Sequence, residues 1–258
     1  MFKSLVVGAV AAVASAGCAL GPAEPPPLRG SHAVLFVGNS LTYSNGLPVM
    51  MQAVAQQIGD TTVAVAVVAY PDYALSDHFL QGTTRDWMRR RTLSHVVLQQ
   101  GSSALPESQV HLREWTRQFA PLIRETGAEP VLFMVWPTTA RLFDFPNVAD
   151  SYRSAAAAVN GIFAPAGAAW VEYARATSGL DVPNAAAFSA LYADGLHPTV
   201  LGTYLSAIVL LERITGASPA SLPPVIPGFP ASTEVVRGLQ HAATVVLAAN
   251  PAYPHAVP

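Results

Sequence analysis

The chain has 258 residues, 51% of them hydrophobic and only 12% charged, so it can bury a large core and wholesale disorder is excluded. Its 14 lysines and arginines and formal net charge of −2 provide no broad basic surface, which argues against nucleic-acid binding. The single cysteine excludes both a disulfide within the chain and a cysteine-rich zinc site.

The first residues have the layout of an export signal. Lys3 supplies a positive charge, an uncharged run extends from Leu5 to Ala16, and small residues lead to Cys18. The run is too short to span a bilayer, and the residues before Cys18 resemble a bacterial lipobox; an ordinary cleaved signal is the alternative. We expect residues 1–17 to be removed, and Cys18 to anchor the exported protein to a membrane of a bacterial cell envelope. The proline-rich residues 18–30 would form an extended tether.

Short apolar runs alternate with helical patterns along the rest of the chain. This alternation predicts a parallel sheet that is covered by helices on both faces. In chain order, the expected elements are a strand at residues 33–37, a helix at 48–58, strands at 61–68 and 95–98, a helix at 110–126, a strand at 130–135, a helix at 150–163, a short strand at 169–171 and a helix at 199–215.

The last part of the chain contains a connector with five prolines at residues 218–230, followed by a predicted helix at 233–250. Too few residues follow the connector to form a core of their own. We therefore predict one domain over residues 31–258, with the last helix docked on it.

The segment Gly38-Asn39-Ser40-Leu41-Thr42 comes directly after the first predicted strand. Ligands bind beyond the carboxyl ends of strands in open α/β sheets. Ser40 is therefore placed for nucleophilic attack, provided that a base lies within reach. The alternative is that Ser40 only caps the helix that follows.

A second segment, Asp194-Gly195-Leu196-His197-Pro198, precedes the long apolar helix. The proline disfavours a helical conformation at His197, so the imidazole projects from a loop. Asp194 can turn back to accept a hydrogen bond from Nδ1 of His197 and fix its tautomer. A local turn that merely caps the helix is the alternative, but the two segments together are far more specific than either alone.

With these two segments, the sequence resembles the SGNH hydrolase superfamily, also called GDSL-type esterases and lipases, over roughly residues 33–215. The first segment resembles the variant block with Gly-Asn-Ser in place of Gly-Asp-Ser, and the second matches the family's last block. The resemblance implies an α/β fold of the SGNH or flavodoxin-like type, a three-layer α/β/α sandwich with a central sheet of about five parallel strands. It also implies that Ser40 is the nucleophile, His197 the general base and Asp194 the residue that orients the base.

The two middle blocks depart from the family's pattern. Where the family takes a backbone N–H from a glycine, this chain has Asp72, with Gly82 as a weaker candidate. Where the family has an asparagine amide, this chain has Gln99 and Gln100. The resemblance implies an oxyanion hole formed by the N–H groups of Ser40 and Asp72 and by one glutamine amide. The alternative is that both glutamines only satisfy backbone groups at the strand end.

The prediction is therefore an exported, lipid-anchored serine esterase or lipase-type hydrolase that forms an acyl-enzyme on Ser40. It implies no metal and no organic cofactor, and its partners are a small-molecule or polysaccharide-borne ester, the membrane through the anchor, and no nucleic acid. One alternative is a non-catalytic envelope binding protein, which the departures in the middle blocks favour. Another is a carbohydrate O-acetyl esterase, because the family includes such enzymes.

Two further residues have no assigned chemistry. His78, within Asp77-His78-Phe79, is expected at the surface or at a helix cap rather than as a ligand. Trp136 follows the fourth predicted strand and lies either at the mouth of the pocket or at the rim of the core.

Overall fold

The computed structural model describes residue 28, residues 30–89 and residues 92–251. The expected export signal, Cys18 and the tether up to residue 27 lie outside the described residues, as does residue 29.

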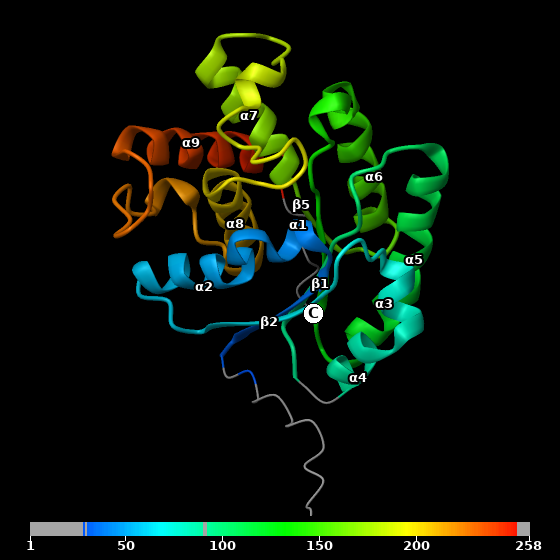
Figure 1. Ribbon diagram of the computed structural model, residues 1–258. Coiled ribbons are helices and arrows are strands. Elements are labelled where there is room, and N and C mark those ends of the chain that lie inside the picture. The colour runs from blue at the N-terminus through cyan, green and yellow to red at the C-terminus, as the bar shows by residue number, and fades with distance from the viewer. Residues whose placement is uncertain (1–27, 29, 90–91, 252–258) are drawn as a thin grey trace, which may run out of the picture.

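The strands form one parallel sheet in the order β2-β1-β3-β4-β5 (Figure 1). The central strand is buried on both faces, and the side chains of Val34, Leu35, Phe36 and Val37 are fully inaccessible. A continuous apolar run of this kind is typical of a parallel strand with helices on both sides. The strands are β1 (His32–Gly38), β2 (Val63–Ala69), β3 (His95–Leu98), β4 (Glu129–Phe133) and β5 (Ile162–Ala164).

Helices cover both faces of this sheet and complete the predicted three-layer sandwich (Figure 1). The α-helices are α1 (Ser40–Tyr43), α2 (Leu47–Gln57), α3 (Leu75–Gln81), α4 (Thr83–Arg89), α5 (Pro106–Glu125), α6 (Phe145–Ala157), α7 (Ala166–Ser178), α8 (Val200–Thr215) and α9 (Thr233–Ala249). Short 3-10 turns occur at η1 (Ser44–Gly46), η2 (Thr139–Asp144), η3 (Ala185–Phe188) and η4 (Pro219–Ser221).

The helices form two layers. Helix α2 packs on α8, and α9 packs on both α7 and α8; on the other side, α5 packs on α3 and α6. The proline-rich connector contains η4 and leads into α9. No helix in the described part of the chain has the length and apolar character needed to cross a membrane.

The prediction for the fifth strand is wrong. Residues 169–171 lie within α7, and β5 occupies residues 162–164. The predicted helix at 150–163 included the first two residues of this strand, whereas the observed α6 ends at Ala157. Three apolar residues are too few to distinguish a period of two from a period of 3.6. The longer segment does show the helical spacing, because one face of α7 is buried at Ala166, Ala169, Trp170, Tyr173 and Ala174.

The sheet order places a binding site beside the end of β1. The chain runs from β1 outward to β2, then crosses back to pair β3 with the other side of β1. The helix after β1 belongs to the layer of α2 and α8, whereas the helix after β3 belongs to the layer of α5 and α6. Ligands of open α/β sheets bind at such a switch point, beyond the carboxyl ends of the strands.

Candidate active site

The serine lies at the switch point, as the first residue of α1. The preceding Asn39 caps this helix, since its Oδ1 accepts a hydrogen bond from the N–H of Leu41 at 3.1 Å. Its Nδ2 donates to the carbonyl of Tyr73 at 3.1 Å. An aspartate could make the first contact but not the second, because an ionised carboxylate only accepts. The Gly-Asn-Ser variant thus ties the turn after β1 to the loop between β2 and α3.

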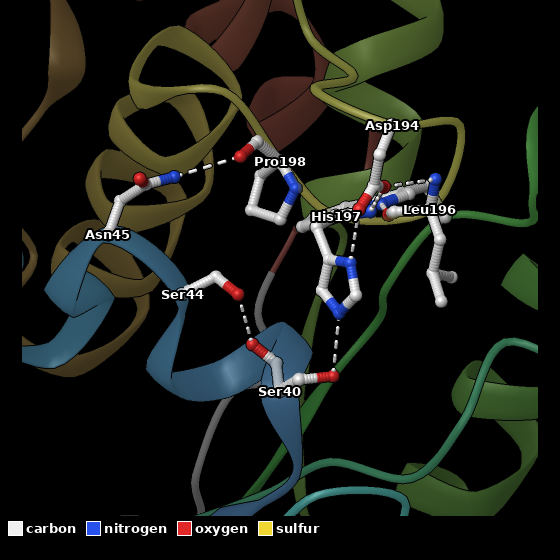
Figure 2. Close-up of polar contacts among 8 residues, drawn as sticks. Ser40, Ser44, Asn45, Asp194, Leu196, His197 and Pro198 are labelled. Atoms are coloured by element: carbon white, nitrogen blue, oxygen red, sulfur yellow. Dashed lines mark hydrogen bonds and ion pairs between the residues drawn. The ribbon is translucent and has the colours of Figure 1, made fainter.

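The histidine and aspartate approach Ser40 from the loop before α8 (Figure 2). Nδ1 of His197 lies 2.8 Å from Oδ2 of Asp194, and Nε2 lies 3.0 Å from Oγ of Ser40. A carboxylate can only accept, so the imidazole proton resides on Nδ1. Nε2 therefore presents its lone pair to the serine hydroxyl, in the arrangement needed to remove that proton.

Asp194 is exposed, yet its charge is well stabilised. Oδ1 accepts from the N–H of His197 at 2.7 Å and from the N–H of Leu196 at 3.0 Å, while Oδ2 accepts from the imidazole. These bonds lower the pKa of Asp194 to about 2; the N–H of His197 contributes most, then its imidazole and the N–H of Leu196. The carboxylate is thus ionised throughout the neutral range, and three donors fix its orientation.

An open cleft of about 630 Å³ lies in front of Ser40. Two carboxylates, six hydroxyl side chains (that of Ser40 included) and one imidazole contribute to its walls, and no lysine or arginine is among the described lining residues. Apolar atoms nevertheless make up most of the exposed lining. With two carboxylates and no cationic side chain on its walls, the cleft suits an uncharged ligand better than an anionic one. The cleft is lined by Asn39, Ser40, Leu41, Asp72, Tyr73, Ala74, Gln100, Gly101, Ser102, Ser103, Glu107, Ser108, His111, Thr138 and Leu196.

Two backbone N–H groups are available in this cleft. Those of Ser40 and Asp72 donate to no other group within the described part of the chain. Asp72 has a φ of 60°, the left-handed conformation that favours glycine, so this loop does make the tight turn for which the family pattern has a glycine. Gly82, the weaker candidate, does not line the cleft, and its N–H caps α3 by donating to the carbonyl of His78.

The two glutamines have different surroundings. The amide of Gln99 is buried beneath the turn, where Oε1 accepts from the N–H of Asn39 at 2.9 Å and from the hydroxyl of Thr42 at 2.8 Å, and Nε2 donates to the carbonyl of Gln100. Gln100 lines the cleft, and its Oε1 accepts from Nδ1 of His111 at 3.1 Å. That contact leaves the Nε2 of Gln100 as the group free to donate to a ligand. Of the predicted pair, Gln100 is therefore the side chain that can serve an oxyanion.

The turn before Ser40 requires a glycine. A Cβ at Gly38 would lie 2.3 Å from the hydroxyl of Thr42 and 2.4 Å from Oε1 of Gln99. Both distances are far shorter than a van der Waals contact. The hydrogen-bonded pair Gln99–Thr42 can therefore pack against this turn only when residue 38 has no side chain.

His78 is not at the surface, and this expectation was wrong. Its side chain is fully buried, and Nε2 donates to the carbonyl of Gly38 at 2.8 Å. Burial lowers the pKa of His78, so the neutral form is favoured. The signal was present in the sequence, because His78 lies three residues after Leu75 and the two are the buried residues of α3.

Trp136 belongs to the core but also supports the base. Its ring is fully buried and stacks on Trp170 with centroids 3.7 Å apart. Its Nε1 donates to the carbonyl of Leu196 at 2.8 Å. Because Leu196 immediately precedes His197, the end of β4 holds the loop that carries the imidazole.

Comparison with solved structures places this architecture among hydrolases. The chain is similar to a protein from Slackia heliotrinireducens described as an SGNH hydrolase, with 26% identity, a TM-score of 0.57, and 70% of this chain and 98% of the other covered. It is also similar to a DUF4886 family protein from Bacteroides uniformis (17%, TM-score 0.65, 84% and 95% covered) and to the acetylxylan esterase Axe2 from Geobacillus stearothermophilus (15%, TM-score 0.53, 74% and 97% covered). Searches of family profiles and of curated proteins found no match.

Proposed function

We propose, on the premise that this chain belongs to the SGNH/GDSL superfamily of ester hydrolases, that it cleaves carboxylic esters through an acyl-enzyme on Ser40. The observation that carries the proposal is the continuous relay from Oγ of Ser40 through His197 to Asp194, with contacts of 3.0 Å and 2.8 Å. The relay opens on a cleft with free N–H donors, which is what acyl transfer requires.

In the acylation step, Oγ of Ser40 attacks the ester carbonyl carbon while its proton moves to Nε2 of His197. The carbonyl oxygen becomes an oxyanion, which accepts hydrogen bonds from the N–H groups of Ser40 and Asp72 and from the amide of Gln100. Asp194 stabilises the imidazolium but does not itself take a proton. Collapse of the intermediate breaks the bond to the alcohol oxygen, which leaves with the proton from Nε2.

In the second step, a water molecule replaces the alcohol. Nε2 of His197 takes one proton from the water as its oxygen attacks the acyl carbon, and the same oxyanion hole holds the negative charge. Expulsion of Oγ, which regains its proton from Nε2, releases the carboxylic acid and restores Ser40. No group outside this chain and water is needed to balance the reaction.

The proposal is tested with the purified full chain, a panel of p-nitrophenyl esters of increasing acyl length, and a fluorophosphonate probe. Wild type should hydrolyse at least the short esters and carry the probe on Ser40. Ser40→Ala should lose both activities, whereas Ser103→Ala, which removes another hydroxyl from the same cleft, should retain probe labelling. Absence of turnover and labelling in wild type would instead favour a non-catalytic binding protein.

A carbohydrate O-acetyl esterase is the more specific candidate, and the polar side chains among the lining residues support it. Serine and threonine hydroxyls, carboxylates and an amide surround the space in front of Ser40, and such groups pair with sugar hydroxyls. The similar Axe2 is an acetylxylan esterase. We therefore expect acetylated xylo-oligosaccharides to be better substrates than long-chain p-nitrophenyl esters. The reverse order would favour a lipase-type hydrolase.

We further propose that the enzyme is exported and anchored through Cys18. Support comes from the charged start, the short apolar run and the small residues before that cysteine. Mass spectrometry of the membrane fraction should find an acylated N-terminal Cys18, with more than one chain because a single chain binds only marginally. A mature N-terminus elsewhere, with unmodified Cys18, would contradict the anchor and leave the esterase proposal intact.

A further inference from the structure

The nucleophile and the base come from segments that are far apart in the sequence. Asp194 and His197 share one loop and orient each other, but Ser40 lies 157 positions before His197. The 3.0 Å contact between them therefore depends on how the two segments are held together. Errors of about 1 Å at such a contact can reduce the rate roughly 100-fold.

The backbone of the base loop is almost completely hydrogen-bonded. The N–H groups of Leu196 and His197 donate to Asp194, and the carbonyl of His197 accepts from Ala193. The carbonyls of Gly195 and Leu196 accept from Thr139 and Trp136, which follow β4. The carbonyl of Pro198 is the last acceptor, and its partner in the described residues is the side chain of Asn45.

Asn45 belongs to the segment that carries the nucleophile, five residues after Ser40 (Figure 2). Its Nδ2 donates to the carbonyl of Pro198 at 2.8 Å and to Oγ1 of Thr203 at 3.0 Å. Thr203 is buried in α8 and donates onward to the carbonyl of Thr199 at 2.9 Å. Both N–H bonds of the amide are thus used, one on the residue after the base and one on the helix that follows.

We propose that Asn45 is a positioning residue that sets the base loop in register with Ser40; the inference rests on the proposed role of His197 as general base. The backbone supports this assignment, since Asn45 has a φ of 51°, a left-handed conformation that asparagine tolerates better than most residues. That conformation turns the chain between α1 and α2 so that the amide reaches Pro198. The side chain of Asn45 is itself exposed, although its partners Pro198 and Thr203 are buried. Its removal therefore opens a space that water can enter beside the two groups left behind, and we expect folding to tolerate it.

The test is Asn45→Gly, because glycine keeps the left-handed conformation whereas alanine would strain it. In the full-length enzyme, kcat should fall roughly 10- to 100-fold, with little change in KM and in Tm. Asn45→Asp should lose as much, since it keeps the shape but turns an oxygen toward Pro198. The matched control is Asn160→Gly, which removes another left-handed asparagine (φ of 49°) remote from the cleft and should leave kcat unchanged.

A double-variant cycle separates positioning from a general structural effect. If Asn45 acts through the imidazole, Asn45→Gly should reduce wild-type kcat but cause no further loss in the His197→Ala background. Equal losses in both backgrounds, or a loss matched by Asn160→Gly, would overturn the proposal while leaving the triad intact. Full activity of His197→Ala would overturn the proposed function itself, and the role of Asn45 with it.

Discussion

Replacing Tyr152 by phenylalanine tests how the cleft side chain Gln100 is held. The phenol of Tyr152 is fully buried, accepts from the N–H of Gln100 at 3.0 Å and donates to the Gln100 carbonyl. Burial raises the pKa of Tyr152 well above its usual value, so the hydroxyl remains neutral and can donate at any working pH. Its ring stays in place in the phenylalanine variant, so no large cavity is formed.

The expected loss of stability in this variant depends on which backbone groups of Gln100 lose their hydrogen-bond partner. In Tyr152→Phe, the carbonyl of Gln100 still accepts from Nε2 of Gln99, but the N–H of Gln100 is left buried without an acceptor. An unsatisfied buried group costs about 1–3 kcal/mol, which corresponds to a Tm decrease of roughly 2–4 °C per kcal/mol in a domain of this size. We also expect kcat to fall, because Gln100 is then free to shift away from the oxyanion.

Tyr204→Phe is the matched control. Its phenol is also buried and accepts from Gln240, but that amide nitrogen has further acceptors at Leu222 and Pro223, and none of these residues lines the cleft. Denaturant unfolding and ester turnover of both variants decide the matter. A Tyr152→Phe variant as stable as wild type would contradict the proposed role of Tyr152. A decrease of kcat in Tyr204→Phe as large as that in Tyr152→Phe would contradict it as well.

Three further predictions concern Gln100, which lines the cleft, and the buried residues near the turn that carries Ser40. Gln100→Ala should lower kcat by about 10²–10³ with little loss of stability, as for removal of an oxyanion donor. Gln99→Ala should also lower the free energy of unfolding, because its buried partners lose their hydrogen bonds. Equal decreases in Tm for the two variants would contradict this contrast. Gly38→Ala should cost about 1–3 kcal/mol by overpacking, measured by urea unfolding against Gly101→Ala, whose added Cβ would meet open space. The pKa of His78 is lowered in the folded protein, so the unfolded chain binds more protons and wild-type stability should fall as the pH drops below about 6.5. The difference in free energy of unfolding between wild type and His78→Gln should therefore vary with pH in that range. A difference that is independent of pH would exclude the effect.

Much of the architecture was accessible from the sequence because apolar runs and helical periods are local properties. The strand at residues 95–98 was predicted with its observed bounds, and the apolar helix after Thr199 begins at Val200. The prediction for residues 162–171 was wrong, because this short segment contains both a three-residue strand and the first turns of a helix. Tertiary packing, rather than local pattern, decides between them.

The candidate site was only partly accessible, for a related reason. Ser40, Asp194 and His197 stand out because a strand end and an Asp-x-x-His-Pro segment are visible in the sequence, and their mutual distance was then supplied by the fold. The different surroundings of Gln99 and Gln100 could not be predicted. Adjacent residues at a strand end point to opposite sides, but the sequence does not show which side faces the cleft. Nothing local indicates that Asn45 reaches Pro198, 153 positions away.

Asp194 and His197 form a pair that is largely independent of the rest of the fold. The carboxylate gains its low pKa from donors within its own loop, and it remains exposed, so neither burial nor a distant cation is required to keep it charged. The rest of the fold therefore does not set the pKa of Asp194, but it determines where the pair lies relative to Ser40. Two contacts from outside the loop hold it there: Trp136 donates to the carbonyl of Leu196, and Asn45 donates to the carbonyl of Pro198. Substitutions at these supports should therefore act mainly on the alignment of Ser40 with the base, and those within the loop on the base itself.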